Sequence, residues 1–548
     1  MQRVFLAVVL GWSVSAAGAE FFVSPSGNDA NDGKSAKSAW KTVAKVNAAA
    51  FAPGDAIHFA RGGEWHESLK ASSSGANGSP IVYDAFGDEK LAKPKFWGSD
   101  VLVNANFKDE GNHVYSYAIK EDVRHVLADH AVGPKGCWFA LADEAKGKKV
   151  AETPNGFFWK DGTLRIHCDG DPRADGRVYT GCLREDIVHS NAKNFVVFRN
   201  LVADESANAH ELGYCFRVMG SSDVRLEDCE AYRAGIHHFG TINSTRFVGL
   251  RLYCAYAMPA EAAATFYVSY SDQSRKDDEH LWDSCVAEHL ENPGRRNHMC
   301  IYNHGPGLGN LTIKNLTSHG GMMSCGQDTP ATHVKVIGGL LDNANMEMFA
   351  SDVLVDGLTL RGPNAVIDIY GSNDVFQNVR LLDVDPKGGG PTGYSAAFLC
   401  RDKALNNTLR FSTIVLKNPD ANAIVLTGKE NQASWYGNII QGKKALWLPS
   451  GGFAAANMKQ VQCNLYSAGM TFEGQDFAAW QAHGLDKESR SGDAVFADAD
   501  GKLKAGSPAI DAAKSLDSAA IPATDAVGTK RPTGAAADMG AVEFSPGK

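Results

Sequence analysis

A short apolar strip recurs through the middle of this chain and constrains its fold more than any other feature. Apolar residues alternate with residues of any kind in the strip, and Asp or Asn often stands just ahead of it. The clearest copies are Val196–Leu201, Val224–Cys229, Leu311–Leu316, Val334–Gly339 and Val353–Leu358, with looser copies starting at Phe247 and Val375. Successive starts lie 28, 23, 64, 23, 19 and 22 residues apart. Units this short cannot bury an apolar face alone, so neighbouring units must stack into a solenoid.

The interval of 64 residues after Phe247 leaves room for two longer coils, with a degenerate copy near His280. Period-2 strands that end in Gly, Asn, Asp or Ser predict an all-β chain whose parallel strands coil into a rod, a parallel β-helix. The 548 residues, 44% of them apolar, and the 56 glycines suit a large core with many tight turns. Each coil presents one outward side chain beside the next, about 4.8 Å away.

Residues 1–19 have the features of a cleavable signal peptide. Arg3 gives a basic start, an apolar run too short to span a bilayer follows, and Ala17-Gly18-Ala19 suits a signal peptidase. We expect the mature chain to begin at Glu20 and to be secreted, periplasmic or held at the cell surface, with no membrane insertion.

Four further segments are predicted. Residues 20–61 form an N-terminal cap and the first strands, with an amphipathic helix within Trp40–Phe51 that covers the open end of the rod. Residues 62–192 form early coils with an inserted β-subdomain. Residues 193–445 form the β-helix core with the active groove, and residues 446–548 form the last coils and a tail packed on the rod.

Both ends of the chain resemble a known group of proteins. FFVSPSGNDANDG (residues 21–33), followed by a helix and PGDAIHF (residues 53–59), is similar to the start of exported bacterial right-handed parallel β-helix proteins of the pectin-lyase-like superfamily. SPAID (residues 507–511), then RP and DMGAVE (residues 538–543), is similar to their common ending, although Ala512 and Ala513 stand where glycine is usual. The resemblance implies a right-handed parallel β-helix, in a superfamily of lyases, glycoside hydrolases, esterases and binding proteins.

The motifs of the best-known enzymes of that superfamily are missing. A polygalacturonase would carry NTD, DD, GHG and RIK in order, whereas here Asp277-Asp278 lies in a charged loop, Ser318-His319-Gly320 replaces GHG, and nothing matches RIK. A calcium-binding aspartate cluster of the pectate-lyase kind does not assemble either. The sequence therefore favours neither of these two activities.

Net charge and cysteine spacing limit the kinds of binding partner, metal site and disulfide that the chain could have. The net charge of −9, without a basic aromatic cluster, excludes nucleic acid and gives no general attraction for a polyanion. The eleven cysteines include no CxxC pair and fall mostly in or beside strands, so stacked or buried thiols are expected, with one or two disulfides as the alternative and no cysteine metal site. A polysaccharide or glycan is the predicted partner, and the oligomeric state stays open.

One strand of each coil predicts a column of outward side chains. In Cys215–Met219 the apolar Phe216 and Val218 point inward, so Arg217 points outward. Applied coil by coil, the rule gives Arg217, His238, Tyr267, Tyr302 or His304, Ser324, Glu347, and Asp368 with Tyr370. Such a column suits a glycan groove, although each residue alone could belong to a solvated face. Trp282 is either a further stacking platform or part of the core.

Glu347 and Asp368 are the predicted catalytic pair. On neighbouring coils their carboxylates would lie about 5 Å apart, the separation of a retaining glycosidase. Their repulsion would raise one pKa, as a general acid requires. A shift of register by one residue would instead turn Glu347 away. His238 is the third catalytic candidate, with the adjacent His237 expected to face inward.

The predicted substrate-binding residues are Arg217, Tyr267, Tyr302, His304, His319 and Tyr370. The histidines lack the spacing of metal ligands, so no metal site is expected. No cofactor is predicted. Calcium is the one alternative, since the loop Asp272–Glu279 is acidic but lacks the alternating ligand pattern of a dedicated site.

Together these residues predict a secreted carbohydrate-active enzyme that hydrolyses glycosidic bonds of a glycan laid along the coils. The first alternative is a polysaccharide lyase, in which His238, Tyr267 or Tyr302 abstracts the C5 proton of a uronate and Arg217 neutralises its carboxylate. The second is a glycan-binding or adhesin rod without catalytic activity.

Overall fold

The computed structural model describes residues 18–131, 140–141, 149–208, 213–256, 264–269, 279–288, 299–304, 310–327, 331–386, 392–450 and 457–546. Among these, the side chains of residues 140–141, 299–300, 302–304 and 327 are not described. The predicted signal peptide, except for its last two residues, and the calcium-candidate loop, except for Glu279, lie outside the described residues.

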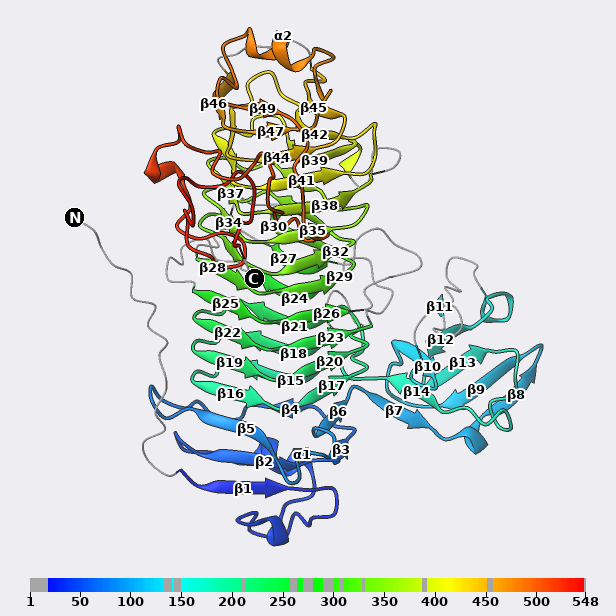
Figure 1. The fold of residues 1–548 in the computed structure, drawn as a ribbon. Coiled ribbons are helices and arrows are strands. Elements are labelled where there is room, and N and C mark those ends of the chain that lie inside the picture. Colours follow the sequence, from blue (N-terminus) through cyan, green and yellow to red (C-terminus); the bar gives the residue numbers. More distant parts are fainter. Residues whose placement is uncertain are drawn as a thin grey trace.

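Three long parallel sheets run along a rod, so the predicted all-β parallel β-helix is confirmed (Figure 1). Sheet A contains the strips found in the sequence. Its strands are β1 (Glu20–Val23), β2 (Ala56–Ala60), β5 (Ile81–Phe86), β16 (Val196–Arg199), β19 (Val224–Glu227), β22 (Phe247–Leu250), β25 (His280–Asp283), β28 (Leu311–Lys314), β31 (Lys335–Ile337), β34 (Leu354–Asp356), β37 (Val375–Gln377), β40 (Asn407–Arg410), β43 (Ala433–Tyr436) and β46 (Met458–Gln462).

Sheet B follows sheet A in each coil. Its strands are β3 (Glu64–Trp65), β6 (Lys95–Trp97), β17 (Val202–Asp204), β20 (Glu230–Tyr232), β23 (Tyr253–Ala255), β26 (Val286–Glu288), β29 (Thr317–His319), β32 (Leu340–Asp342), β35 (Thr359–Arg361), β38 (Arg380–Val384), β41 (Thr413–Leu416), β44 (Ile439–Gln441), β47 (Leu465–Tyr466) and β49 (Arg490–Ser491).

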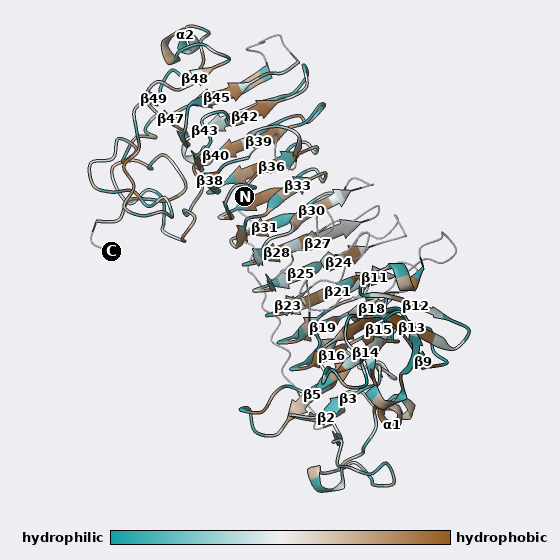
Figure 2. Ribbon diagram, turned by 90° about the vertical axis from the view of Figure 1, so that its right-hand side faces the viewer, coloured by the Kyte–Doolittle hydropathy of each residue, from teal (hydrophilic) through white to brown (hydrophobic). Residues whose placement is uncertain are grey.

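Sheet C completes the coil, and its strands are labelled along the length of the rod in Figure 2. Its strands are β4 (Leu69–Lys70), β15 (Asp186–Asn191), β18 (Tyr214–Met219), β21 (His237–Ile242), β24 (Ala264–Ser269), β27 (Met299–His304), β30 (Met322–Gln327), β33 (Asn345–Met348), β36 (Ile367–Ile369), β39 (Ala396–Cys400), β42 (Asn422–Leu426), β45 (Lys444–Trp447) and β48 (Thr471–Phe472).

The Asp and Asn residues ahead of the strips have a backbone role. Asp223, Asn310 and Asp352, each directly before a strip, have φ of 59°, 68° and 58°. Short polar side chains tolerate this left-handed conformation best, so these residues turn the chain from sheet C into sheet A.

The interior of the rod is a continuous stack of apolar side chains. Phe216, Phe239 and Phe266 lie on successive coils with ring centroids 5.0 and 5.7 Å apart. Trp282 is 1% exposed and packs on Phe247, so it belongs to the core and is not a sugar platform. Nine described cysteines are free, buried thiols, which confirms that prediction for them.

One short helix lies near each end of the rod (Figure 1). Helix α1 (Val43–Ala48), within the predicted Trp40–Phe51 segment, starts at a Thr42 N-cap and buries Val43 and Val46 in the main core. Helix α2 (Phe477–Gln481) buries Trp480 at the other end. Short 3₁₀ helices are Ala36–Ser38, Asn104–Asn106, Val150–Glu152 and Ser518–Ala520. None of the described helices is long and apolar enough to cross a membrane.

A small β-unit projects beside the first coils between β6 and β15 (Figures 1 and 2). It contains the antiparallel strands β7 (Ser99–Leu102), β14 (Tyr179–Cys182) and β10 (His125–Ala128), and a second sheet of β8 (Lys108–Gly111), β9 (Val114–Ala118), β13 (Thr163–His167), β12 (Gly156–Lys160) and β11 (Ala140–Leu141). The buried Glu205 of the rod joins the unit through Ser99, Thr180 and His130, at 2.6, 2.9 and 2.7 Å. The C-terminal segment packs along the rod on a second apolar cluster that includes Phe411, Ile439 and Met539.

Candidate functional site

One row of side-chain positions runs along the outside of sheet C, and we call it the outer row. Strand pairing aligns Arg217, Gly240, Tyr267, Tyr302, Ser324, Glu347, Asp368, Leu399, Val425 and Trp447 in it. Six predicted column members, from Arg217 to Asp368, therefore share one register. Exposed Tyr370 lies two residues beyond Asp368.

His238 is not in the outer row, and its predicted outward orientation is wrong. Its side chain is fully buried, with Nε2 3.1 Å from the carbonyl oxygen of Ala255 in sheet B. Gly240 takes the position beside Arg217, because both His238 and Phe239 are buried and strict alternation fails where the chain enters β21. Burial lowers the pKa of His238 to about 4, so the ring stays neutral near pH 7.

His237 is the histidine on the outer side, also opposite to the prediction. Its ring stacks on Tyr267 at 4.1 Å with an angle of 10° between planes, and it contacts Tyr214 at 4.9 Å. Tyr267 packs with Ala264 and Met322 in a small cluster separate from the main core. In the same region, Arg217 is 9% exposed and its Nη2 lies 2.7 Å from Asp186 Oδ2.

Glu347 and Asp368 lie directly opposite each other on β33 and β36. Adjacent strands are about 4.8 Å apart, so the two side chains rise from the sheet as neighbours. Glu347 is half-buried, whereas Asp368 is only 1% exposed. Burial, and then the charge of Asp368, raise the pKa of Glu347. Burial also raises the pKa of Asp368.

Arg401 makes the two carboxylates different, because it forms hydrogen bonds with Asp368 and none with Glu347. Its Nε and Nη2 donate to Asp368 Oδ1 and Oδ2 at 2.8 and 2.7 Å, which opposes the effect of burial on the pKa of Asp368. Arg401 lowers the pKa of Glu347 only through its charge, without a hydrogen bond. The bidentate hydrogen bonds from Arg401 favour the ionised form of Asp368. When the pair carries one proton, that proton is therefore expected on Glu347.

Aromatic rings surround this group. Arg401 Cζ lies 5.4 Å from the ring centroid of Tyr370 and 5.1 Å from that of Tyr394. Tyr370 is 39% exposed and stacks on Phe349 at 4.2 Å. The sequence did not predict Arg401 and Tyr394, because coil lengths vary and periodicity alone does not show which residue of a later coil lies beside Asp368.

The remaining predicted residues do not all join this site. Tyr302 and His304 are on β27 of sheet C, and their side chains lie outside the described residues. His319 ends β29 of sheet B, where Nδ1 lies 3.2 Å from exposed Asp342, so it is on a different sheet from Glu347. Within the described ranges, no group of three or more His, Cys, Asp or Glu side chains could hold a metal ion.

Comparison with known proteins found a partial sequence match and several distant structural likenesses. No model of a known protein family matches the sequence. A lacto-N-biosidase of Bifidobacterium longum subsp. longum is 29% identical over 134 residues, which cover 22% of this chain and only 8% of that protein.

Among solved structures, XylC in complex with xylose covers 96% of this chain and 99% of its own, at 10% identity and a TM-score of 0.45. A GH136 lacto-N-biosidase from Eubacterium ramulus covers 82% and 67%, at 12% identity and a TM-score of 0.38. The match to the pectate lyase Pel9A covers 96% of this chain and 96% of Pel9A, at 11% identity and a TM-score of 0.37. Likeness at this level does not bear on the reaction. The long parallel sheets confirm the parallel β-helix architecture suggested by the ends of the chain.

Proposed function

We propose that this protein is a carbohydrate-active enzyme that hydrolyses glycosidic bonds of a glycan bound along the outer row of sheet C. The register pairing of Glu347 with Asp368 is the observation that carries the proposal. Two outward carboxyl groups about one strand spacing apart suit a retaining glycosidase. The partial match to a lacto-N-biosidase agrees with a carbohydrate substrate.

The proposed catalytic roles follow from the different environments of Glu347 and Asp368. Protonated Glu347 donates its proton to the glycosidic oxygen as the bond to the anomeric carbon breaks, and ionised Asp368 bonds to that carbon. Arg401 donates to both Asp368 oxygens and Tyr370 donates one further hydrogen bond, which leaves the carboxylate at least one lone pair for the anomeric carbon. Glu347 then removes a proton from water, which attacks the anomeric carbon and releases Asp368.

A polysaccharide lyase is the second candidate. The stacked His237 and Tyr267 near Arg217 supply a base and a cation on the same face. This reading is weaker, because Arg217 already pairs with Asp186 and is not free to neutralise a uronate carboxylate. Tyr267→Phe would abolish lyase activity and leave hydrolysis by the carboxylate pair largely intact.

Carboxamide variants of the full chain test the proposal. Glu347→Gln and Asp368→Asn should each lower kcat by at least about a hundredfold. Asp383→Asn is the matched control, because Asp383 also pairs with a cation, Lys417, but on sheet B. Reducing ends and ultraviolet absorbance should be followed together on neutral, uronate-containing and sulfated polysaccharides.

Stability separates loss of chemistry from loss of fold. Glu347→Gln should unfold like the wild type, whereas Asp368→Asn should cost about 1–3 kcal/mol because it removes the bidentate partner of Arg401. Normal turnover in both variants would eliminate the carboxylate pair. An unsaturated product that absorbs in the ultraviolet would show that the protein is a lyase and not a hydrolase.

A further inference from the structure

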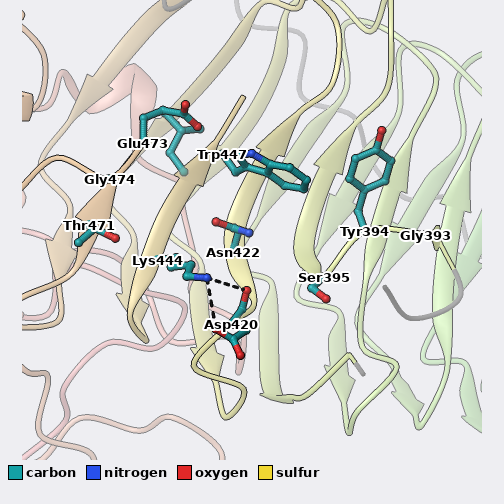
Figure 3. A pocket seen from close by; sticks show the side chains of 11 residues that line it. Gly393, Tyr394, Ser395, Asp420, Asn422, Lys444, Trp447, Thr471, Glu473 and Gly474 are labelled. Atoms are coloured by element: carbon teal, nitrogen blue, oxygen red, sulfur yellow. Dashed lines mark hydrogen bonds and ion pairs between the residues drawn. The ribbon is translucent and has the colours of Figure 1, made fainter. Parts of the chain in front are cut away.

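A pocket of about 620 Å³ continues the outer row beyond the carboxylate pair (Figure 3). It lies over β42, β45 and β48, and its lining includes Tyr394, Trp447, Asn422, Asp420, Lys444 and Glu473. All of these residues belong to sheet C or to the connections beside it. The pocket and the carboxylate pair therefore lie on the same sheet of the rod.

Tyr394 lies between the two sites. Its ring centroid is 5.1 Å from Arg401 Cζ on one side and 5.8 Å from the ring of Trp447 on the other. In the outer row, Leu399 and Val425 separate Asp368 from Trp447. Three strand steps correspond to about 14 Å, the length of a short oligosaccharide.

The lining combines an aromatic surface with convergent polar groups. Trp447 is 39% exposed despite its large apolar surface, and Figure 3 shows its ring near Asn422 and on the side of Tyr394. Lys444 Nζ lies 3.4 Å from Asp420 Oδ1, below the ring in the same view. Flat rings match the apolar faces of sugar rings, and carboxylate, amide and ammonium groups match vicinal hydroxyls.

The charge of the pocket selects against acidic sugars. Asp420 and Glu473 contribute two carboxylates, whereas Lys444 contributes one ammonium group that already pairs with Asp420. An incoming uronate or sulfate would meet net negative charge from the described lining residues, whose one cation, Lys444, already pairs with Asp420.

We propose that this pocket is a distal subsite for a neutral sugar unit, with Trp447 as its stacking platform and Asp420, Asn422 and Lys444 as hydroxyl partners. This inference rests on the proposed function and adds the substrate class: a neutral oligosaccharide long enough to span the outer row from Glu347 to Trp447. The distal subsite contributes binding energy to long substrates and none to short ones.

Direct binding tests the subsite apart from catalysis. Hexasaccharides of glucose, xylose, mannose and N-acetylglucosamine, and a galacturonate hexamer, should be titrated calorimetrically into full-length Glu347→Gln protein. At least one neutral hexasaccharide should bind, and adding Trp447→Ala should weaken it at least about fivefold. Adding Trp447→Phe, which keeps a ring, should weaken it less. Val495→Ala, which removes an exposed apolar side chain elsewhere, should bind normally.

Chain length gives a second readout in the active protein. Trp447→Ala should raise KM for the hexasaccharide while leaving kcat/KM for a disaccharide of the same sugar unchanged. Trp447-dependent binding without any turnover would overturn the proposed hydrolase and keep the subsite. Unchanged hexasaccharide affinity in Trp447→Ala, absence of binding to every neutral hexamer, or tighter binding of the galacturonate hexamer would overturn the subsite.

Discussion

At the scale of single residues, the burial and the hydrogen-bond partner of a side chain decide whether it can act in the proposed site. His238 and Asp368 are both almost completely buried, yet one is bonded to a backbone carbonyl inside the rod and the other to Arg401 on its outer side. The same sequence rule gave both residues an outward side chain. Only the residue with a charged partner in the outer row remains suited to catalysis.

Asp374 illustrates the cost of a buried carboxyl group without a cation. It is fully buried, its Oδ1 accepts from the Val353 backbone N–H at 3.0 Å, and its Oδ2 has no hydrogen-bond partner among the described residues. Burial raises its pKa to about 8. The folded state therefore keeps a proton that the unfolded state releases above about pH 4.

We predict that Asp374→Asn removes a pH dependence of stability. Between about pH 4 and 8 this carboxyl group should make the free energy of unfolding fall by about 1.4 kcal/mol per pH unit, and the dependence should level off above pH 8. Asp374→Asn keeps the acceptor for the Val353 N–H. Its free energy of unfolding should therefore rise relative to that of the wild type as pH increases. Urea unfolding at pH 5 and pH 8 measures this, with exposed Asp88→Asn as the control. Parallel profiles for wild type and Asp374→Asn would contradict it.

At the scale of elements, buried polar ladders help to fix the register of the coils. Between sheets A and B, Asn438 Oδ1 accepts from the Ser412 backbone N–H at 2.8 Å, and the Asn438 backbone N–H donates to Asn464 Oδ1 at 3.1 Å. The Asn438 Nδ2 group also donates to the Leu409 carbonyl at 3.0 Å. These bonds satisfy backbone groups that the turn leaves outside the strand ladders.

Asn438→Ala should destabilise the C-terminal coils. The substitution leaves the buried Ser412 N–H and Leu409 carbonyl without these partners, at a cost of about 2–4 kcal/mol. Asn364→Ala is the control, because Asn364 makes an exposed side-chain bond to Asn343 across one coil and should change stability by less than about 0.5 kcal/mol. Chemical denaturation of both variants decides this, and equal midpoints would show that the ladder contributes nothing.

For the whole molecule, Arg531 connects the C-terminal segment to the rod and also forms a buried ion pair within that segment. Arg531 and Glu543 are both fully buried, with Nη1 2.6 Å from Oε1. Arg531 also donates to Asn378 Oδ1, between β37 and β38, at 3.3 Å, and its guanidinium lies 4.9 Å from the centroid of Phe411. One cation thus connects the tail to two coils that precede it by more than a hundred residues.

Arg531→Met should weaken this attachment. It leaves Glu543 as a buried charge without its cation, which typically costs about 3–5 kcal/mol. The expected result is a lower midpoint of thermal unfolding and faster proteolysis within residues 493–546. Lys530→Met, at the exposed neighbouring position, is the control. Wild-type protease resistance in Arg531→Met would show that the apolar contacts of the tail suffice.

The sequence alone determined the repetitive part of this protein. Alternating strips, and turn residues suited to positive φ, are local signals, so the stacked parallel sheets and the shared register of Arg217, Tyr267, Glu347 and Asp368 could be predicted from them.

Only the tertiary structure decided which residues gather around that row. Coil lengths vary, so the sequence does not show that Arg401 returns to Asp368, 33 residues earlier, or that Tyr394 lies between the carboxylate pair and Trp447. Strict alternation also fails at the corner that buries His238, because two successive side chains there are buried. Local periodicity fixes the direction of a side chain within a regular strand, whereas contacts between coils depend on the length and path of every intervening turn.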